Sequence, residues 1–214
     1  MAMVLFNRLK DNNMAEINNS NNNNIYTIDC EGDGLSKDLN RVVFPDGNHF
    51  DPDTRIWCIT ITNPNFKTYT SVCKIPGTRT LPNGWTTKAY HLPTTKVPNR
   101  IWACGEFHNV IEFINYYDFL WNIHNILELL PNVHFKGFGD HDYDKELLRV
   151  NFKKYNIDTI PLKKMVNVNP TRWTKTEEQV HTSYYLPNQD YLNYGIKHNI
   201  EDTIQLMRYM KGIV

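Results

Sequence analysis

The chain has 214 residues, with 23 basic and 23 acidic side chains and a hydrophobic content of 41%. This length suits one folded domain with a short extension, and the balanced charge argues against a protein that coats nucleic acid or membranes through a large basic surface. No apolar stretch approaches the ~20 residues of a membrane span, and the four cysteines show no spacing suited to zinc. We expect a reduced, intracellular and soluble protein.

Residues 1–24 are rich in asparagine and poor in apolar side chains. Such a segment buries too little apolar surface to offset its ordering entropy, so we expect a flexible N-terminal extension. The folded domain is expected to span residues 25–214. The asparagine content also suggests an AT-rich, viral genome, in which case the protein would act in the host cytoplasm or nucleoid.

Three strand-like segments open the domain. Residues 25–31, 55–62 and 67–75 are rich in β-branched and aromatic side chains, which favour an extended backbone. The short link at 63–66 predicts that the second and third segments form an antiparallel hairpin.

The next part of the chain changes character. Residues 76–109 carry Pro, Gly and Thr without a regular period, and we interpret them as a surface insertion with a short strand near 101–104. From Val110 to Leu130 apolar residues recur at steps of three and four, which is typical of an amphipathic helix.

Helices and strands alternate over the rest of the chain. A strand is expected at 133–138, a helix at 142–155 and a last helix from Tyr191 or Ile196 to Met210, while residues 163–190 predict no element. A hairpin followed by this alternation predicts an α/β fold, with a mixed β-sheet flanked by α-helices.

The first strand carries two carboxylates, Asp29 and Glu31. Because side chains two residues apart on a strand share a face, the two acids are expected to lie side by side. Adjacent carboxylates repel each other unless a cation lies between them. The pair therefore indicates either a metal site or a solvated surface turn. Cys30, between them, is expected to face the core, and Asp33 to be a turn residue.

Two later segments contain acids that could join this pair. Asp144 lies in the first turn of the second predicted helix, where the helix dipole favours a carboxylate; it is equally an ordinary helix-start acid, like Asp140 and Asp142. His198 and Asp202 are four residues apart and share a face of the final helix, as part of a site or as a surface His/Asp pair.

Together, Ile28-Asp-Cys-Glu31, Gly139-Asp-His-Asp-Tyr-Asp144 and His198-Asn-Ile-Glu-Asp202 form an ordered set that resembles the DEDD superfamily of 3′–5′ exonucleases. The likeness is greatest to the proofreading exonuclease domain of phage-type enzymes of the DNA polymerase I family, and it covers roughly residues 25–210. It implies a ribonuclease-H-like fold and hydrolysis of phosphodiester bonds at the 3′ end of DNA. Such an enzyme would act alone or as a proofreading subunit beside a DNA polymerase.

Two positions depart from the family pattern. Asp140, or Gly139 with a longer spacing, stands where the family usually has Asn upstream of the catalytic Asp. His198 lies four residues before Asp202, which is the spacing of the tyrosine in the Tyr subfamily. The His subfamily places its histidine five residues before the last Asp.

The resemblance implies roles for five residues. Asp29, Glu31, Asp144 and Asp202 would hold two divalent ions, Mg²⁺ or Mn²⁺, about 3.5–4 Å apart, because carboxylates are suitable hard ligands for these ions. His198, whose imidazole titrates near neutral pH, would act as the base toward the attacking water.

Four further residues are candidates for binding the substrate. Leu35 would wedge against the terminal bases, or pack as a loop leucine on the core, and Asp140 would lie on the substrate side of the middle motif. Lys163 and Lys164 would meet the phosphate backbone, or belong to a solvated basic loop.

Two other functions remain open from the sequence. One is a 3′–5′ exoribonuclease on the same scaffold, since no residue pattern here distinguishes RNA from DNA. The other is a catalytically inert domain that binds nucleic acid or a replisome partner. Degradation of DNA and RNA oligonucleotides from their 3′ ends distinguishes the three.

Overall fold

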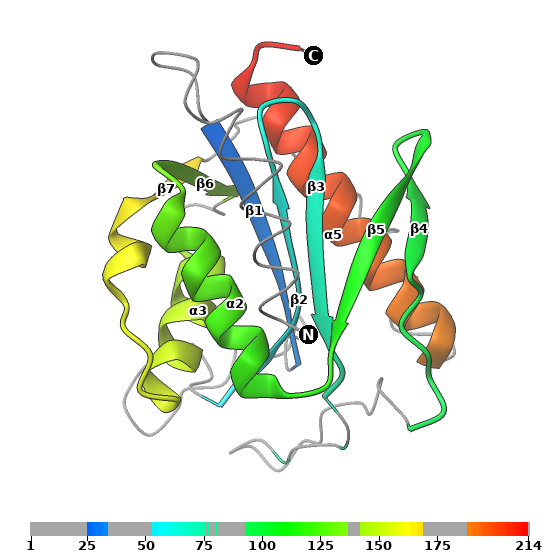
Figure 1. The fold of residues 1–214 in the computed structure, drawn as a ribbon. Helices are drawn as coiled ribbons and strands as arrows, with labels where there is room; N and C mark the ends of the chain where they lie inside the picture. Colours follow the sequence, from blue (N-terminus) through cyan, green and yellow to red (C-terminus); the bar gives the residue numbers. More distant parts are fainter. Residues whose placement is uncertain are drawn as a thin grey trace.

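The computed structural model describes residues 25–33, 53–75, 77, 80, 93–136, 142–168 and 188–213. These residues form a seven-stranded mixed sheet packed against three α-helices, which confirms the predicted α/β class (Figure 1). The strands are β1 (Ile25–Gly32), β2 (Ile56–Thr62), β3 (Thr68–Cys73), β4 (Arg100–Ala103), β5 (Glu106–Phe113), β6 (Asn132–Lys136) and β7 (Met165–Val168). The helices are α2 (Tyr116–Leu129), α3 (Tyr143–Lys154) and α5 (Asn188–Met210), with a 3₁₀ helix η2 (Ile160–Lys164).

The sheet has the strand order β4-β5-β3-β2-β1-β6-β7. Strand β2 pairs antiparallel with β1 on one side and with β3 on the other. The predicted hairpin of the second and third strands is therefore confirmed. On the other side of β1, the strands β6 and β7 run parallel to it. β1 therefore lies inside the sheet, and its carboxyl end lies at the same edge as those of β6 and β7.

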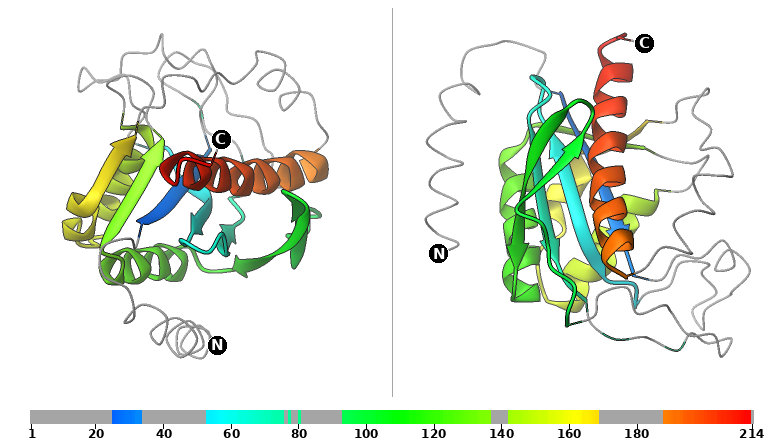
Figure 2. Two further views of the ribbon diagram at one scale, coloured as in Figure 1. Left: turned by 90° about the horizontal axis from the view of Figure 1, so that it is seen from above. Right: turned by 90° about the vertical axis from the view of Figure 1, so that its right-hand side faces the viewer.

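The two faces of the sheet are covered by different helices (Figure 2). Tyr26, Ile28 and Cys30 of β1 belong to a core that includes buried residues of α2 and α3. The intervening residues Thr27 and Asp29 make hydrogen bonds to α5. The alternation of a strand thus directs Cys30 into the core, as expected, and Asp29 toward α5.

Helix α5 approaches the sheet closely through small and hydroxylated residues. A Cβ atom added at Gly195 would lie 2.6 Å from the Trp57 ring on β2. Thr27 donates its hydroxyl to the Thr203 carbonyl at 2.8 Å, and the Thr62 hydroxyl lies 2.8 Å from the Thr203 hydroxyl. These contacts fix α5 against β1 and β2, and with it the segment from His198 to Asp202.

The helix predicted from Val110 is wrong in its first six residues. Val110 belongs to β5, which pairs with both β3 and β4, and α2 begins only at Tyr116. Asn115 starts that helix because its side chain accepts hydrogen bonds from the backbone N–H groups of Tyr117 and Asp118. The apolar step that suggested a longer helix includes Ile114, which is 99% exposed.

The prediction also missed one element in the second half of the chain and misplaced the start of another. The segment that predicted no element contains the short strand β7, in which Met165 alone is buried. Helix α5 begins at Asn188, before either predicted start. Among the described residues, none of the helices combines the length and the apolar character that crossing a membrane requires.

Candidate functional site

The last helix meets the first strand at Asp29. Asn199 of α5 is fully buried, and its Nδ2 donates to Asp29 Oδ2 at 2.6 Å. Its Oδ1 lies 3.7 Å from the Cys58 thiol of β2, which donates to it. The Asn199 amide thus donates a hydrogen bond through its nitrogen and accepts one through its oxygen. The bond from the nitrogen fixes the orientation of the Asp29 carboxylate. Sequence reasoning gave Asn199 no role although it lies in the His198–Asp202 motif, because an asparagine inside a helix does not by itself indicate a function.

Asp202 lies at the same end of the sheet and is buried, with 7% of its surface exposed. Its Oδ2 lies 3.6 Å from His198 Nε2 and 3.8 Å from Lys136 Nζ. The His198 ring stacks on the ring of Tyr194 one turn earlier, with an interplanar angle of 16°. The predicted His/Asp pair therefore forms on one face of α5, and it faces the protein rather than bulk solvent.

Lys136, the last residue of β6, is a second residue that sequence reasoning missed. Val133 and Phe135 of β6 belong to the core on the side of α2 and α3, so Lys136, one residue further, lies on the α5 side. The paired register of β1 and β6 ends at Ile28 and Phe135, and the next step brings Lys136 alongside Asp29. With 6% of its surface exposed, Lys136 is a buried cation within this group of acids.

Asp144 reaches β1 from the other side. It lies in the first turn of α3 and is 4% exposed. Burial raises the pKa of the Cys30 thiol well above its usual value, and the charges of Asp144 and Asp29 add to that shift in this order. Burial likewise raises the pKa of the Tyr143 hydroxyl, with contributions from Asp144 and then Glu31. Asp144, Asp29 and Glu31 therefore all raise the pKa of one shared neighbour, Cys30 of β1.

The chemistry of these donors fits a divalent ion, because carboxylate oxygens are the ligands that Mg²⁺ and Mn²⁺ prefer. The distances between these carboxylates, however, are longer than a shared metal ion requires. Among the side chains that the structure describes, no three His, Cys, Asp or Glu residues lie close enough together to hold a metal ion as they stand. Asp202 is directed toward Lys136 and His198, and Asp144 approaches from the Cys30 side, which accounts for the separation.

The other predicted residues lie elsewhere. Lys163 and Lys164 are exposed on η2, directly before β7, and Lys164 Nζ donates to the Glu128 carbonyl at the end of α2. They are at the amino ends of the parallel strands, whereas the acids are at the carboxyl ends. Leu35 and Asp140 lie outside the described residues.

Two further acids near the site have structural partners. Asp33 forms an ion pair with Arg55 at 2.6 Å and accepts its backbone N–H, as suits the expected turn residue. Asp142 lies at the N-cap position of α3, but its side chain makes no cap hydrogen bond there. It accepts instead from the Asn167 amide at 2.6 Å.

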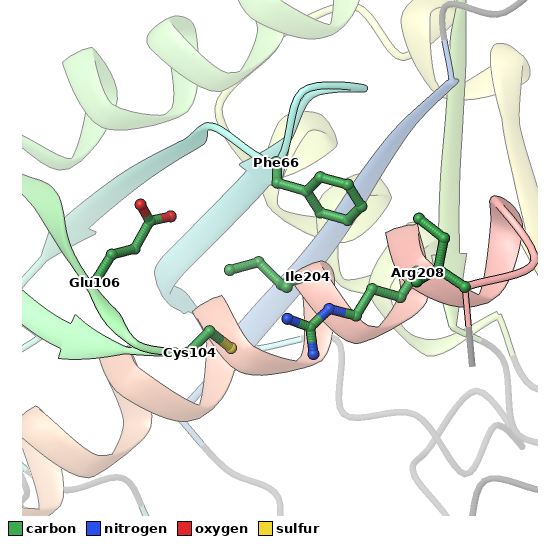
Figure 3. A pocket seen from close by; sticks show the side chains of 6 residues that line it. Phe66, Cys104, Glu106, Ile204 and Arg208 are labelled. Carbon is green, nitrogen blue, oxygen red and sulfur yellow. The ribbon is translucent and has the colours of Figure 1, made fainter.

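A pocket of about 180 Å³ lies at the opposite end of the sheet, beside the β2–β3 turn and the C-terminal half of α5 (Figure 3). It is lined by Phe66, Cys104, Glu106, Ile204, Arg208 and Ile213. None of the predicted site residues lines it. The candidate site is therefore the group of acids at the carboxyl end of β1.

Comparison of the sequence with protein-family models and with curated protein sequences finds no match, so the interpretation of this site depends on its residues and their geometry.

Proposed function

We propose that this protein is a divalent-metal-dependent 3′–5′ exonuclease that removes nucleotides from the 3′ end of a DNA strand, alone or beside a DNA polymerase. One observation carries the proposal. Three short motifs that lie far apart in the sequence are on elements that contact the carboxyl half of β1: Asn199 of α5 donates a hydrogen bond to Asp29, and a Cβ atom added at Gly32 would lie 2.8 Å from the hydroxyl of Tyr143, the residue before Asp144 on α3.

The order of the strands supports the proposal. The strands β3, β2, β1, β6 and β7 are neighbours in this order, with antiparallel pairing up to β1 and parallel pairing after it. A ribonuclease-H-like core has this order and these directions. The strands β5 and β4 would extend such a core beyond β3, and the final helix α5 would carry the last motif across the face opposite α2 and α3.

The residues of the site suit hydrolysis of a phosphodiester. When bound to Asp29, Glu31, Asp144 and Asp202, divalent ions would polarise the phosphate and lower the pKa of an attacking water. His198 would accept the proton of that water at Nε2, because its ring is held by Tyr194 and its side chain remains 19% exposed and hence reachable by water. Asn199 would keep Asp29 oriented through its hydrogen bond.

The test is degradation of a 5′-labelled single-stranded DNA oligonucleotide by the full-length protein with Mn²⁺. We expect a ladder of products shortened from the 3′ end, and its loss in Asp29→Asn, Asp144→Asn and Asp202→Asn. Asp190→Asn is the matched control, because Asp190 is an exposed acid on the same helix as Asp202. Full activity in Asp29→Asn would refute the assignment of the site.

His198 has its own test. We expect His198→Ala to lower the rate by about 10²–10⁴-fold, the usual contribution of a general base, with Mn²⁺ binding retained. Unchanged turnover would remove His198 as the base. An RNA oligonucleotide of the same sequence decides the substrate, since faster shortening of RNA would indicate the exoribonuclease. Binding of either strand without any shortening would indicate the inert domain.

A further inference from the structure

We propose that the face of β4 and β5 directed away from α5 is a binding surface for single-stranded nucleic acid, separate from the acids at the carboxyl end of β1. Its centre is a pair of exposed aromatic side chains, Trp102 and Phe107, with Arg100 beside them. No metal ion takes part in this surface. The inference therefore goes beyond the proposed function and does not rest on it.

The pairing of β4 with β5 places these side chains on one face. Arg100 pairs with Asn109, and Trp102 pairs with Phe107, and directly paired residues of antiparallel strands project to the same side. Ala103, the next residue along β4, belongs to the core that contains buried residues of α5. Because side chains alternate along a strand, Trp102 points away from that helix. In Figure 1, α5 runs behind β4 and β5, so this face is turned toward the viewer.

The two aromatic rings are exposed and fixed against each other. Trp102 is 53% exposed and Phe107 is 57% exposed. Their ring centroids are 4.9 Å apart in an edge-to-face arrangement, and the Arg100 guanidinium carbon lies 4.8 Å from the centroid of the Phe107 ring. Large apolar side chains that gather on a protein surface commonly mark a binding site. Here they form a preformed platform, because the rings and the cation hold one another in place.

A second cation borders the rings from the other side. Lys67 is exposed and directly precedes β3, which runs parallel to β5. The Thr68 hydroxyl lies 2.8 Å from Nδ1 of His108, so these two residues are neighbours across the strands. The residues before them, Lys67 and Phe107, are therefore neighbours as well. Positive charge lies on both sides of the aromatic pair, from Arg100 on β4 and from Lys67 beside β3.

The acids of β5 lie on the opposite face. Glu106 pairs with Ala103, and it lines the pocket beside α5 that Figure 3 shows. Glu112 has the same parity along the strand and lies 3.8 Å from Lys74 Nζ. Within β4 and β5 the carboxylates are thus on the face toward α5, and Arg100 is on the face with the rings. This separation of charge complements a polyanion, whereas a partner that covers apolar area alone would not require it.

Aromatic rings flanked by cations suit a single strand of nucleic acid. Bases stack on aromatic side chains, and basic side chains neutralise the phosphates between the bases. A duplex keeps the faces of its bases inside its own stack, so it cannot use the rings in this way. The surface is at the amino ends of β3 and β5, and β3 runs parallel to β1 through two antiparallel pairings. It is therefore at the other edge of the sheet from the acids, where it would anchor a part of the strand remote from them.

The experiment measures binding of a fluorescently labelled oligothymidine to the full-length protein by fluorescence anisotropy, in EDTA so that no strand is cut. We expect Trp102→Ala and Phe107→Ala each to weaken binding about 5–150-fold, the loss of one stacked base. Phe107→Leu keeps an apolar side chain without a ring and should lose as much, while Phe107→Tyr should bind like the wild type. Tyr209→Ala, at an exposed aromatic residue of α5, is the matched control and should leave binding unchanged.

The salt dependence of binding tests the charges. Each phosphate contact to a single strand contributes about 0.7 to the slope of log K against log salt concentration. We expect Arg100→Gln and Lys67→Gln each to make this slope shallower by about that amount. Lys153→Gln, at an exposed lysine of α3, is the control and should leave the slope unchanged.

Each outcome decides the inference. A wild type that does not bind oligothymidine would overturn it, as would unchanged affinity in Trp102→Ala and Phe107→Ala, because the strand would then lie elsewhere. Equal affinity for a duplex, or full affinity in Phe107→Leu, would overturn the stacking. Dimers in sedimentation velocity that Trp102→Ala abolishes, without binding of the strand, would show a contact between two copies of the chain instead. Absence of exonuclease activity would overturn the proposed function alone.

Discussion

The hydrogen bond between Asn199 and Asp29 is the contact that joins the last helix to the first strand at the candidate site, and Asn199→Ala removes it. Asn199 is fully buried, and its Nδ2 is 2.6 Å from a carboxylate oxygen, so the bond is charge-assisted and shielded from water. The substitution also leaves the Cys58 thiol without its acceptor at 3.7 Å, which is a minor loss because thiols are weak donors.

The expected magnitude follows from that geometry. A hydrogen bond to a charged group contributes about 1.5–3 kcal/mol to stability, so we expect the free energy of unfolding of Asn199→Ala to fall by about 2 kcal/mol. In a protein of about 200 residues each kcal/mol lowers Tm by about 2–4 °C, which gives a decrease of about 4–8 °C. Exonuclease activity should fall as well, because Asp29 loses the group that orients it.

Urea unfolding followed by circular dichroism measures the change. Gln205→Ala, at an exposed glutamine of the same helix, is the control and should change stability by less than about 0.5 kcal/mol. A double-mutant cycle with Asp29→Ala isolates the contact. Independent sites add within about 0.3–0.5 kcal/mol, so additivity within this limit would show that the two residues do not interact, and would refute the reasoning.

Three further results are expected. Gly195→Ala should destabilise the fold by about 1 kcal/mol in thermal unfolding, because the overpacking against Trp57 at 2.6 Å exceeds the gain of about 1 kcal/mol in helix propensity; a higher Tm would contradict this. Burial lowers the pKa of His134 below its unfolded value of about 6.5. Stability should therefore decline as the pH falls below about 6.5, since the unfolded chain binds the proton more readily. The variant His134→Gln should show a smaller difference in unfolding free energy between pH 7.5 and pH 5 than the wild type. An unchanged difference would exclude His134 as its source. The native protein should react with Ellman's reagent first at Cys104, since the other three thiols are buried, and more slowly than a free thiol, since partial burial raises the Cys104 pKa; a first phase that persists in Cys104→Ser would refute that.

Some of the fold could be predicted because local sequence and tertiary structure agree. The hairpin of β2 and β3 is an example, since the short link at 63–66 joins two runs of β-branched residues. Strand β5 was missed because Val110 also fits a helical period with later apolar residues. It is a strand because it pairs with β3, which lies far earlier in the sequence but next to β5 in the sheet. Such pairing overrides local propensity.

The site divides in the same way. Asp29 and Glu31, and likewise His198 and Asp202, could be proposed as pairs from the sequence because residue type and spacing within one element place the members of each pair on a common face. Lys136 could not be identified from the sequence in this way, because its place beside β1 depends on the register between β1 and β6. In a strand of unknown neighbours, a terminal lysine is ordinarily assigned to solvent, and only the parallel pairing with β1 directs it toward α5.

One stripe of α5 determines how the site is held. Gly195, Asn199 and Thr203 are spaced by four residues and so lie on one side of the helix, where they contact the sheet. His198 and Asp202 form the adjacent stripe. A larger residue at 195 would move the helix away from Trp57 and lengthen the bond from Asn199 to Asp29, so its effect would extend from packing to chemistry. We therefore expect Gly195→Ala to lower exonuclease activity by a larger factor than its loss of folded protein at the assay temperature explains. Activity in proportion to the folded fraction would show that this stripe serves stability alone.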